Sequence, residues 1–221
     1  MPMTEARRVL DREENQIHQN LLNMARLANG ALEQAMDSLL SQNAELAQQV
    51  IEEDVHINTL LRVVENECLE ALALQQPVAS DLRDIVASMQ IATEIERIAD
   101  HGKDIAKIVL GMDPGDFSGP MDRLSVMSDI CINMLTRVME AYENRDQELA
   151  HAAAEEDGDI DALDEEAASS LMMHLMTQPD PTMHATHLLW IAYHLERTGD
   201  RIKNIAERVV FMVTAETPEL G

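Results

Sequence analysis

The sequence predicts an all-α protein with two tandem three-helix bundles, made of six long antiparallel helices related by an internal repeat. Three observations support this fold class. Aromatic residues make up 2% of the 221-residue chain and Gly and Pro are sparse, which is atypical of β-sandwiches and barrels. Apolar residues recur at the period of amphipathic helices. A short acidic motif also recurs one hundred positions later in the chain.

Three apolar stripes predict the helices of the first half. The first stripe covers residues 10–35, and the second covers residues 47–71 and ends before Pro77. The third covers residues 80–109, and Ser80 is a suitable N-cap for its helix. Three long helices of this kind pack as an antiparallel bundle when short connections join them.

Three further stripes predict the helices of the second half, over residues 124–138, 150–171 and 181–209. Between the halves, residues 111–120 contain three Gly and two Pro, which do not continue a helix. We therefore expect a first bundle at residues 1–112, a linker at 113–120 and a second bundle at 121–221.

The two halves also match residue by residue. Glu96-Arg97-Ile98-Ala99-Asp100 precedes Glu196-Arg197-Thr198-Gly199-Asp200 by one hundred positions. The segment 53–58, which contains Asp54 and Asn58, aligns with the segment 156–161, which contains Asp157 and Asp161. These matches indicate a duplicated three-helix unit.

The charge of the chain restricts its partners. The formal net charge of −25 repels nucleic acids and anionic membrane surfaces, so cations or basic proteins are the better candidates. No apolar run is long enough for a membrane span and no signal peptide is recognisable, so we expect a cytoplasmic protein. No nucleophile with a histidine base and no phosphate loop appears, which argues against an enzyme.

Acidic residues at special positions are the candidate functional residues. Asp54 and Asp157 fall within the apolar stripes of their helices, so each carboxylate must be protonated, paired with a base or bound to a cation. Carboxylates four residues apart share a helix face and repel each other, which favours a neutralising partner. Oxygen donors from two helices suit a hard cation. The candidate ligands are Asp54, Asn58, Glu96, Asp100, Asp157, Asp161, Glu196 and Asp200.

Two interpretations of these acids remain open from the residues alone. In the first, they bind Fe, Mn, Mg or Ca ions, with Zn less favoured because His and Cys are missing from the set. In the second, nearby bases neutralise them in ion pairs. The bases available for this are Arg97, Lys103, Arg197, Arg201 and Lys203.

At these spacings the sequence resembles the PhoU family of accessory regulators of the phosphate-specific transport system. The resemblance rests on Ile95-Glu96-Arg97-Ile98-Ala99-Asp100, repeated as Leu195-Glu196-Arg197-Thr198-Gly199-Asp200, and on the segments 50–54 and 77–83. It spans nearly the whole chain. It implies that the acidic pairs hold metal ions (Fe, Mn, Mg or Zn), and it makes Arg97 and Arg197 candidates for partner binding. Asn58 departs from a strict acidic pair, which implies a weaker first-half site.

The same resemblance implies a regulator that represses phosphate-starvation genes when phosphate is plentiful. Its expected partners are the sensor histidine kinase of the phosphate regulon and the ATPase subunit of the phosphate ABC importer. A homodimer is also expected. Contact with the membrane would then occur only through these partners.

Two other features suggest different metal chemistry. A ferritin-like redox or storage bundle is the main alternative function, since Glu-x-x-His strings occur at Glu53–His56 and Glu148–His151. Their registers do not favour convergence in one core. His174, His184 and His187 could meet and bind a transition metal or sense pH, although core packing is the commoner role of such residues.

Overall fold

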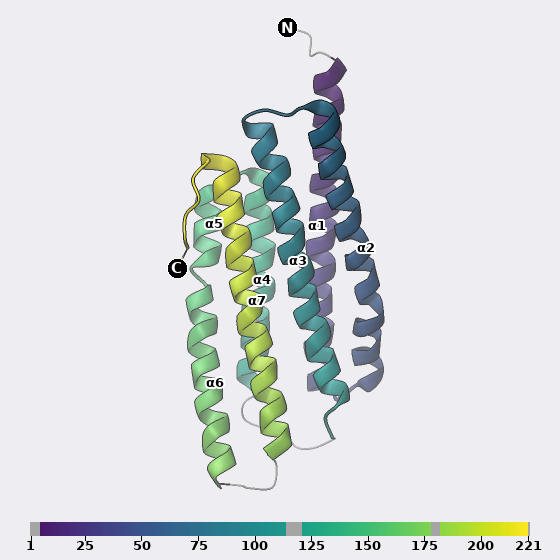
Figure 1. Cartoon of the computed structure of the whole chain (residues 1–221). Helices are drawn as coiled ribbons and strands as arrows, with labels where there is room; N and C mark the ends of the chain where they lie inside the picture. The colour runs from purple at the N-terminus through teal and green to yellow at the C-terminus, as the bar shows by residue number, and fades with distance from the viewer. Residues whose placement is uncertain (1–4, 114–120, 178–181, 221) are drawn as a thin grey trace.

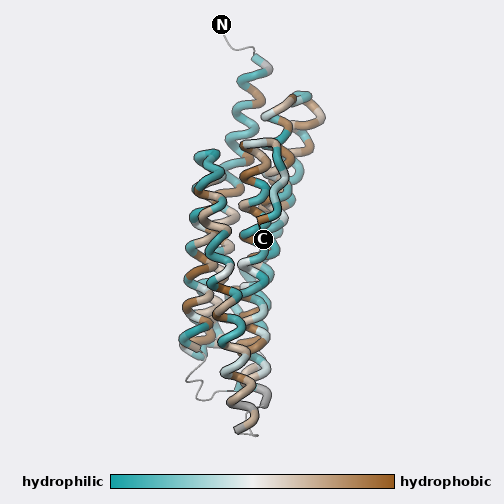
Figure 2. Tube along the Cα trace, turned by 90° about the vertical axis from the view of Figure 1, so that its left-hand side faces the viewer, coloured by the Kyte–Doolittle hydropathy of each residue, from teal (hydrophilic) through white to brown (hydrophobic). Residues whose placement is uncertain are grey.

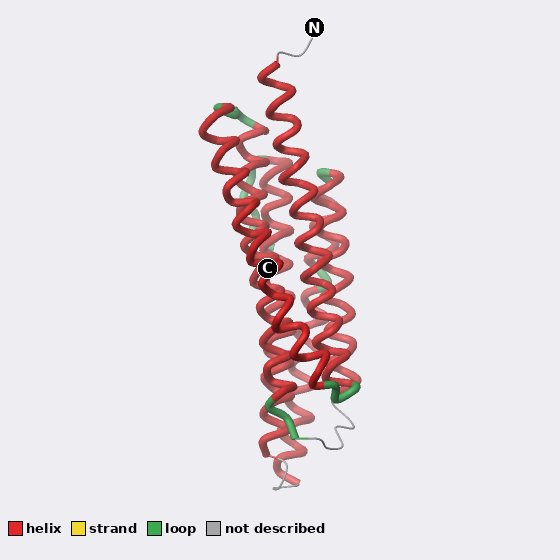
Figure 3. The backbone as a smooth tube through the Cα atoms, turned by 90° about the vertical axis from the view of Figure 1, so that its right-hand side faces the viewer, coloured by secondary structure: helices red, strands yellow, loops and turns green. Residues whose placement is uncertain are grey.

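The computed structural model describes residues 5–113, 121–177 and 182–220, and in these ranges it contains helices and loops without strands (Figures 1 and 3). The all-α class is therefore confirmed. The first three helices are α1 (Glu5–Leu40), α2 (Ala44–Gln75) and α3 (Ser80–Leu110). The others are α4 (Met121–Asn144), α5 (Gln147–Ala154), α6 (Asp157–Thr177) and α7 (Thr182–Thr214). Residues 114–120 of the predicted linker, and the hairpin residues 178–181, lie outside the described ranges.

The six-helix architecture is confirmed, with the predicted fifth helix divided into the short α5 and the longer α6. α5 begins after the N-cap Asp146, whose carboxylate accepts from the amides of Glu148 and Leu149. The break at residues 155–156 lies just before Asp157-Gly158-Asp159, whose helix propensity is poor, and the four acidic residues at positions 155–159 repel one another. α5 and α6 nevertheless continue in one direction along the bundle (Figure 1), so together they take the place of one long helix.

The helices bury the faces that the sequence stripes predict. Apolar and polar stretches alternate along each helix (Figure 2), as expected for amphipathic helices. The buried side chains form one continuous cluster with members from both halves of the chain. α3 packs against α7, and α1 packs against α4, so the two groups of helices share this core. The division into 1–112 and 121–221 remains a prediction about the sequence repeat.

Close contact between α1 and α3 depends on Gly102. A Cβ atom at this position would lie 3.2 Å from the backbone C of Ala31 and the backbone N of Leu32.

The start of α3 differs from the prediction, because the N-cap is Ala79, in the left-handed region at φ 51°, rather than Ser80. No helix in the described part of the chain is long and apolar enough to cross a membrane.

Candidate functional site

The first acidic cluster joins α2 to α3. Asp54 lies on the buried face of α2 and is 9% exposed. Lys103 of α3 donates from Nζ to Asp54 Oδ2 at 2.8 Å and to Asp100 Oδ1 at 2.6 Å. Asn58 donates from Nδ2 to Asp54 Oδ2 at 2.7 Å, while Asp54 Oδ1 is buried without a hydrogen-bond partner. One ammonium group therefore holds two carboxylates from two helices, and one carboxylate oxygen remains unsatisfied.

The second acidic cluster joins α6 to α7 in the equivalent way. Asp157 is the first residue of α6 and is 4% exposed. Lys203 of α7 donates from Nζ to Asp157 Oδ2 at 2.6 Å, and its Nζ lies 3.7 Å from Asp200 Oδ1. Arg197 donates to both oxygens of Glu196 at 2.6 and 2.7 Å, and its Nη1 lies 2.8 Å from Asp200 Oδ2. The duplicated sequence motif thus gives two duplicated acid–base clusters.

Gly199 allows Asp157 to lie directly against the backbone of α7. A Cβ atom at Gly199 would be 2.5 Å from Asp157 Oδ1 and 3.0 Å from Ile160 Cδ1. The first distance is too short for a real contact, so Asp157 occupies the space that a side chain would fill. The counterpart in the first half is Ala99, which has a Cβ. The two clusters therefore differ in how closely the aspartate approaches the neighbouring helix.

The carboxylates of both clusters are held in surroundings that disfavour their charge. Burial raises the pKa of Glu96, and Asp100 adds to the rise. Burial also raises the pKa of Asp157 against the opposing effect of Lys203, and Asp161 and Asp200 add to it. The Lys203 pKa is raised, chiefly by its hydrogen bond to Asp157. In both clusters the positive charge that offsets the carboxylates is supplied by a lysine ammonium.

The basic residues expected to neutralise these acids do so only in part. Lys103, Arg197 and Lys203 pair with the clusters as described above. Arg201 instead lies 3.5 Å from Glu94 Oε2 on α3. Arg97 is exposed, and it acts on the cluster only by opposing the rise in the Glu96 pKa. The ion-pair interpretation is therefore correct for three of the five bases and wrong for Arg201.

The remaining predicted ligands lie close to their clusters. Asp161, one turn after Asp157, is exposed and adds to the rise in the pKa of both Asp157 and Glu196. In the described ranges, no group of three or more His, Cys, Asp or Glu side chains is already arranged to hold a metal ion. Oxygen donors of the required kind are present, but a cation would have to displace the lysine ammonium from among them.

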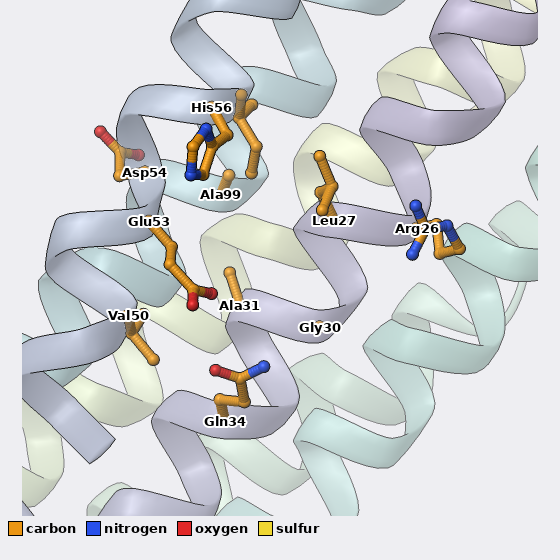
Figure 4. A pocket seen from close by; sticks show the side chains of 11 residues that line it. Arg26, Leu27, Gly30, Ala31, Gln34, Val50, Glu53, Asp54, His56 and Ala99 are labelled. Atoms are coloured by element: carbon orange, nitrogen blue, oxygen red, sulfur yellow. The ribbon is translucent and has the colours of Figure 1, made fainter. Parts of the chain in front are cut away.

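Each cluster borders a cavity. The first cavity, about 160 Å³, lies between α1 and α2 (Figure 4), where Glu53 and Gln34 extend toward one another and Asp54 lies at its edge. The second, about 380 Å³, is bordered by Asp157, Asp161 and Lys203 and by Glu219 and Leu220 of the C-terminal segment. The second cavity is the larger of the two and has the more acidic lining, which are the features that a site for a hydrated cation requires.

Contacts between the halves are functional candidates that sequence reasoning missed. Glu94 of α3 accepts from Asn204 of α7 at 3.3 Å as well as from Arg201. His101 and His194 meet across the same pair of helices, with their Nδ1 atoms 3.1 Å apart. Burial lowers the pKa of His101 to about 4, and His194 adds to that effect. Periodicity alone does not reveal which residues of two distant helices meet.

The ferritin-like alternative is not supported by the structure. Glu53, His56, Glu148 and His151 are all exposed, and the two strings lie on α2 and α5 in different halves. Glu53 and His56 border the first cavity, whereas His151 borders the second. A carboxylate-bridged centre needs all four residues in one core, and these residues do not converge.

Two of the three histidines near the α6–α7 hairpin can be placed in the structure. His187 is 9% exposed, and its ring centroid lies 5.8 Å from that of Trp190. His187 Nδ1 is buried without a hydrogen-bond partner. His184 is half-buried, and the side chain of His174 lies outside the described residues. The predicted meeting of all three is therefore not tested.

Across the described ranges, seven helices with a duplicated acidic motif define an all-helical protein of two related halves. A family model described as the PhoU domain matches residues 21–109 and again 124–209. The chain therefore belongs to the PhoU family, and the two matched ranges contain both acidic clusters.

Known proteins support this assignment. The chain is 31% identical over 210 residues to the "Phosphate-specific transport system accessory protein PhoU homolog" of Rhizobium meliloti, covering 95% of this chain and 89% of the relative. It is 35% identical over 193 residues to the protein of the same name from Zymomonas mobilis, covering 87% and 81%.

Solved structures agree with this relationship. The crystal structure of the phosphate transport system regulatory protein PhoU from Streptococcus pneumoniae matches with a TM-score of 0.88 and 30% identity, covering 95% of this chain and 99% of that one. The crystal structure of PhoU from Pseudomonas aeruginosa matches with a TM-score of 0.89 and 28% identity, covering 93% and 99%.

Proposed function

We propose that this chain is a cytoplasmic regulator of phosphate uptake that represses the phosphate-starvation response when phosphate is plentiful. It acts without catalysis, by linking the phosphate ABC importer, through its ATPase subunit, to the sensor histidine kinase of the phosphate regulon. Membership of the PhoU family supports a role in the regulation of phosphate transport. The observation that carries the proposal is the duplicated acid–lysine cluster, which stands at equivalent positions in both halves.

We also propose that the two clusters bind metal ions, with the second cluster the stronger site. Asp157, Asp161, Glu196 and Asp200 would supply the oxygen donors in the second half. Three observations support this proposal: the raised pKa values of Asp157 and Glu196, the adjoining cavity, and the unsatisfied Oδ1 of Asp54 in the first cluster. A divalent cation at either position supplies more positive charge than the lysine that it displaces.

The regulatory role is tested with a phosphate-starvation reporter in the source organism grown on high phosphate. Deletion of the gene should make reporter expression constitutive, and a plasmid copy of the wild-type gene should restore repression. A copy carrying Glu196→Ala and Asp200→Ala should restore less repression than a matched copy carrying Glu166→Ala, which removes an exposed carboxylate outside the clusters. Unchanged repression in the deletion strain would overturn the regulatory proposal.

The metal proposal is tested separately on purified protein. The protein is incubated with Fe, Mn, Mg or Zn, dialysed, and examined by elemental analysis and circular dichroism. The Glu196→Ala/Asp200→Ala variant should lose bound metal while its helicity stays nearly intact, because both side chains are half-buried and lie outside the apolar core of a long helix, and Ala is a good helix former. Equal metal content in this variant, in Glu166→Ala and in the wild type would overturn the metal proposal.

A further inference from the structure

Four large apolar side chains are exposed near the α6–α7 hairpin. Met172 and Met176 of α6 are 61% and 87% exposed, and Trp190 and Tyr193 of α7 are 51% and 53% exposed. Exposed groups of this size on one face are typical of interaction surfaces. Met adapts to differently shaped partners, and Trp and Tyr are enriched at the centres of interfaces. We call these four residues the α6–α7 patch.

The patch residues point to one side of the molecule. On α6, Met172 and Met176 lie 11 and 15 positions after Asp161, so a helical period places all three within about 60°. On α7, Tyr193 and Arg197 follow Trp190 by three and seven positions, which is also a single helix face.

Interactions between the two helices fix their relative register. Asp161 acts on the pKa of Glu196, and Arg197 opposes the burial-induced rise in the pKa of Asp164. Because Lys203 of α7 also donates to Asp157 of α6 at 2.6 Å, the Asp161 side of α6 borders the Glu196–Arg197 side of α7. Residues 172–176 of α6 and 190–193 of α7 lie nearer the hairpin along their helices (Figure 1).

The surface around the patch is acidic. Asp161 and Glu165 continue its α6 side, and Glu196 and Asp200 continue its α7 side. Among the bases, Arg197 lies on this face, stacked 5.5 Å from the ring centroid of Tyr193. Four carboxylates therefore stand beside the Arg197 guanidinium and the Lys203 ammonium, which lies 3.7 Å from Asp200 Oδ1, so this surface keeps an excess of negative charge. A partner that covers both this surface and the apolar patch must be basic at one end and apolar at the other.

We propose that the α6–α7 patch binds an amphipathic helix of a partner protein, which places large apolar residues on the patch and Lys or Arg residues against the acidic surface. The helix-in-groove mode of recognition uses this chemistry. A second copy of the chain is disfavoured on this face, because it would bring the same carboxylates together. An anionic membrane is disfavoured by the net charge of −25.

The internal repeat provides a built-in comparison. The positions one hundred residues before Trp190 and Tyr193 are Gln90 and Thr93, so α3 lacks the aromatic pair. α2 retains isolated exposed leucines, Leu69 and Leu74, at 55% and 71% exposure. These leucines allow matched substitutions that remove exposed apolar area from the other half.

The binding test uses Trp190, the single tryptophan of the chain, as an intrinsic fluorescent reporter. The probe is a short helical peptide with a leucine face and a lysine face, and the comparison peptide replaces lysine with glutamate. The lysine peptide should shift Trp190 emission to shorter wavelength, and the glutamate peptide should not. Met172→Gln with Met176→Gln should weaken binding about tenfold, because the patch residues act as anchors.

The matched control, Leu69→Gln with Leu74→Gln, should change the affinity by less than about twofold, because both leucines lie on α2, outside the patch. Equal weakening by both pairs, or no weakening by the methionine pair, would overturn the proposal. So would a blue shift that depends on protein concentration without peptide, which indicates self-association, or one caused by phosphatidylglycerol vesicles. This proposal rests on the proposed regulatory function, for which it defines the chemistry of a partner. Peptide binding is measured without any repression readout, so the patch proposal and the regulatory proposal can fail independently.

Discussion

Replacing Lys203 with Met should destabilise the protein by about 3 kcal/mol at pH 7. Asp157 accepts a 2.6 Å hydrogen bond from Lys203, and its side chain is only 6% exposed. Breaking a buried ion pair by removing one partner costs about 3–5 kcal/mol. We take the low end because the Lys203 side chain is 23% exposed. For a chain of this size the loss corresponds to a fall in Tm of roughly 6–12 °C.

The pH dependence of this loss follows from the sign of the shift. Lys203 lowers the pKa of Asp157, so its removal raises that pKa further above the ordinary 3.8. The penalty is present while Asp157 is ionised and disappears as the pH falls through its folded pKa. The difference in free energy of unfolding between wild type and Lys203→Met should therefore shrink on acidification, measured by urea denaturation in EDTA.

The matched control is Lys107→Met, which removes an exposed pair with Asp104 and should cost about 0.5 kcal/mol or less. Divalent cation added to Lys203→Met should restore stability, by about 2.7 kcal/mol at one hundred times the Kd, because the lysine no longer occupies the cluster. A loss no larger than that of Lys107→Met would refute the assignment of Lys203 as the counter-charge of Asp157. Stability unaffected by cations would count against the metal proposal alone.

Three further predictions concern other parts of the fold. Gly199→Ala should lower the free energy of unfolding by about 1–3 kcal/mol in urea titrations, because the new Cβ displaces the Asp157 carboxylate; an unchanged midpoint would contradict it. Burial and neighbouring carboxylates raise the pKa of Glu14 from 4.5 to about 7, so the folded state is disfavoured as the pH rises between these values. Glu14→Gln should therefore match wild type near pH 4.5 and gain about 1 kcal/mol above pH 7 after allowance for solvent screening, measured by thermal melts at both pH values. Tyr142→Phe should cost about 1–2 kcal/mol in the same assay, because it leaves Ser88 without its buried 2.7 Å hydrogen bond; a neutral effect would show that water replaces the phenol.

The sequence was sufficient to predict the helices because burial of one helix face leaves a regular pattern. Ile91, Ile98 and Ile105 are fully buried, as the third stripe predicts. The break between α5 and α6 was missed because Ala150, Ala153 and Ile160 keep a helical spacing across it. Apolar spacing records which residues are buried, and it is insensitive to a short interruption of the backbone.

The pairings within the site were less predictable than its residues. Asp54 and Asp157 were identified because a carboxylate in an apolar stripe needs compensation. Lys203 lies 46 positions after Asp157, and it was one of five candidate bases. Arg201 differs from Lys203 by two positions and therefore points to α3 instead of α6. Selecting between them requires the relative placement of three helices, which depends on packing across the whole bundle.

The two halves have kept the same cluster while diverging in its electrostatics. In the first half, Asn58 donates to Asp54 where the second half has Asp161, so a neutral amide replaces a carboxylate. Ala99 stands at the first-half position equivalent to Gly199, and its Cβ fills the space that Asp157 uses against α7 in the second half. The first change reduces the negative charge around Asp54, and the second reduces the space beside the neighbouring helix. A cation should therefore prefer the second cluster, which also lies next to the acidic α6–α7 surface, so metal occupancy and partner binding would act on one face of the same half.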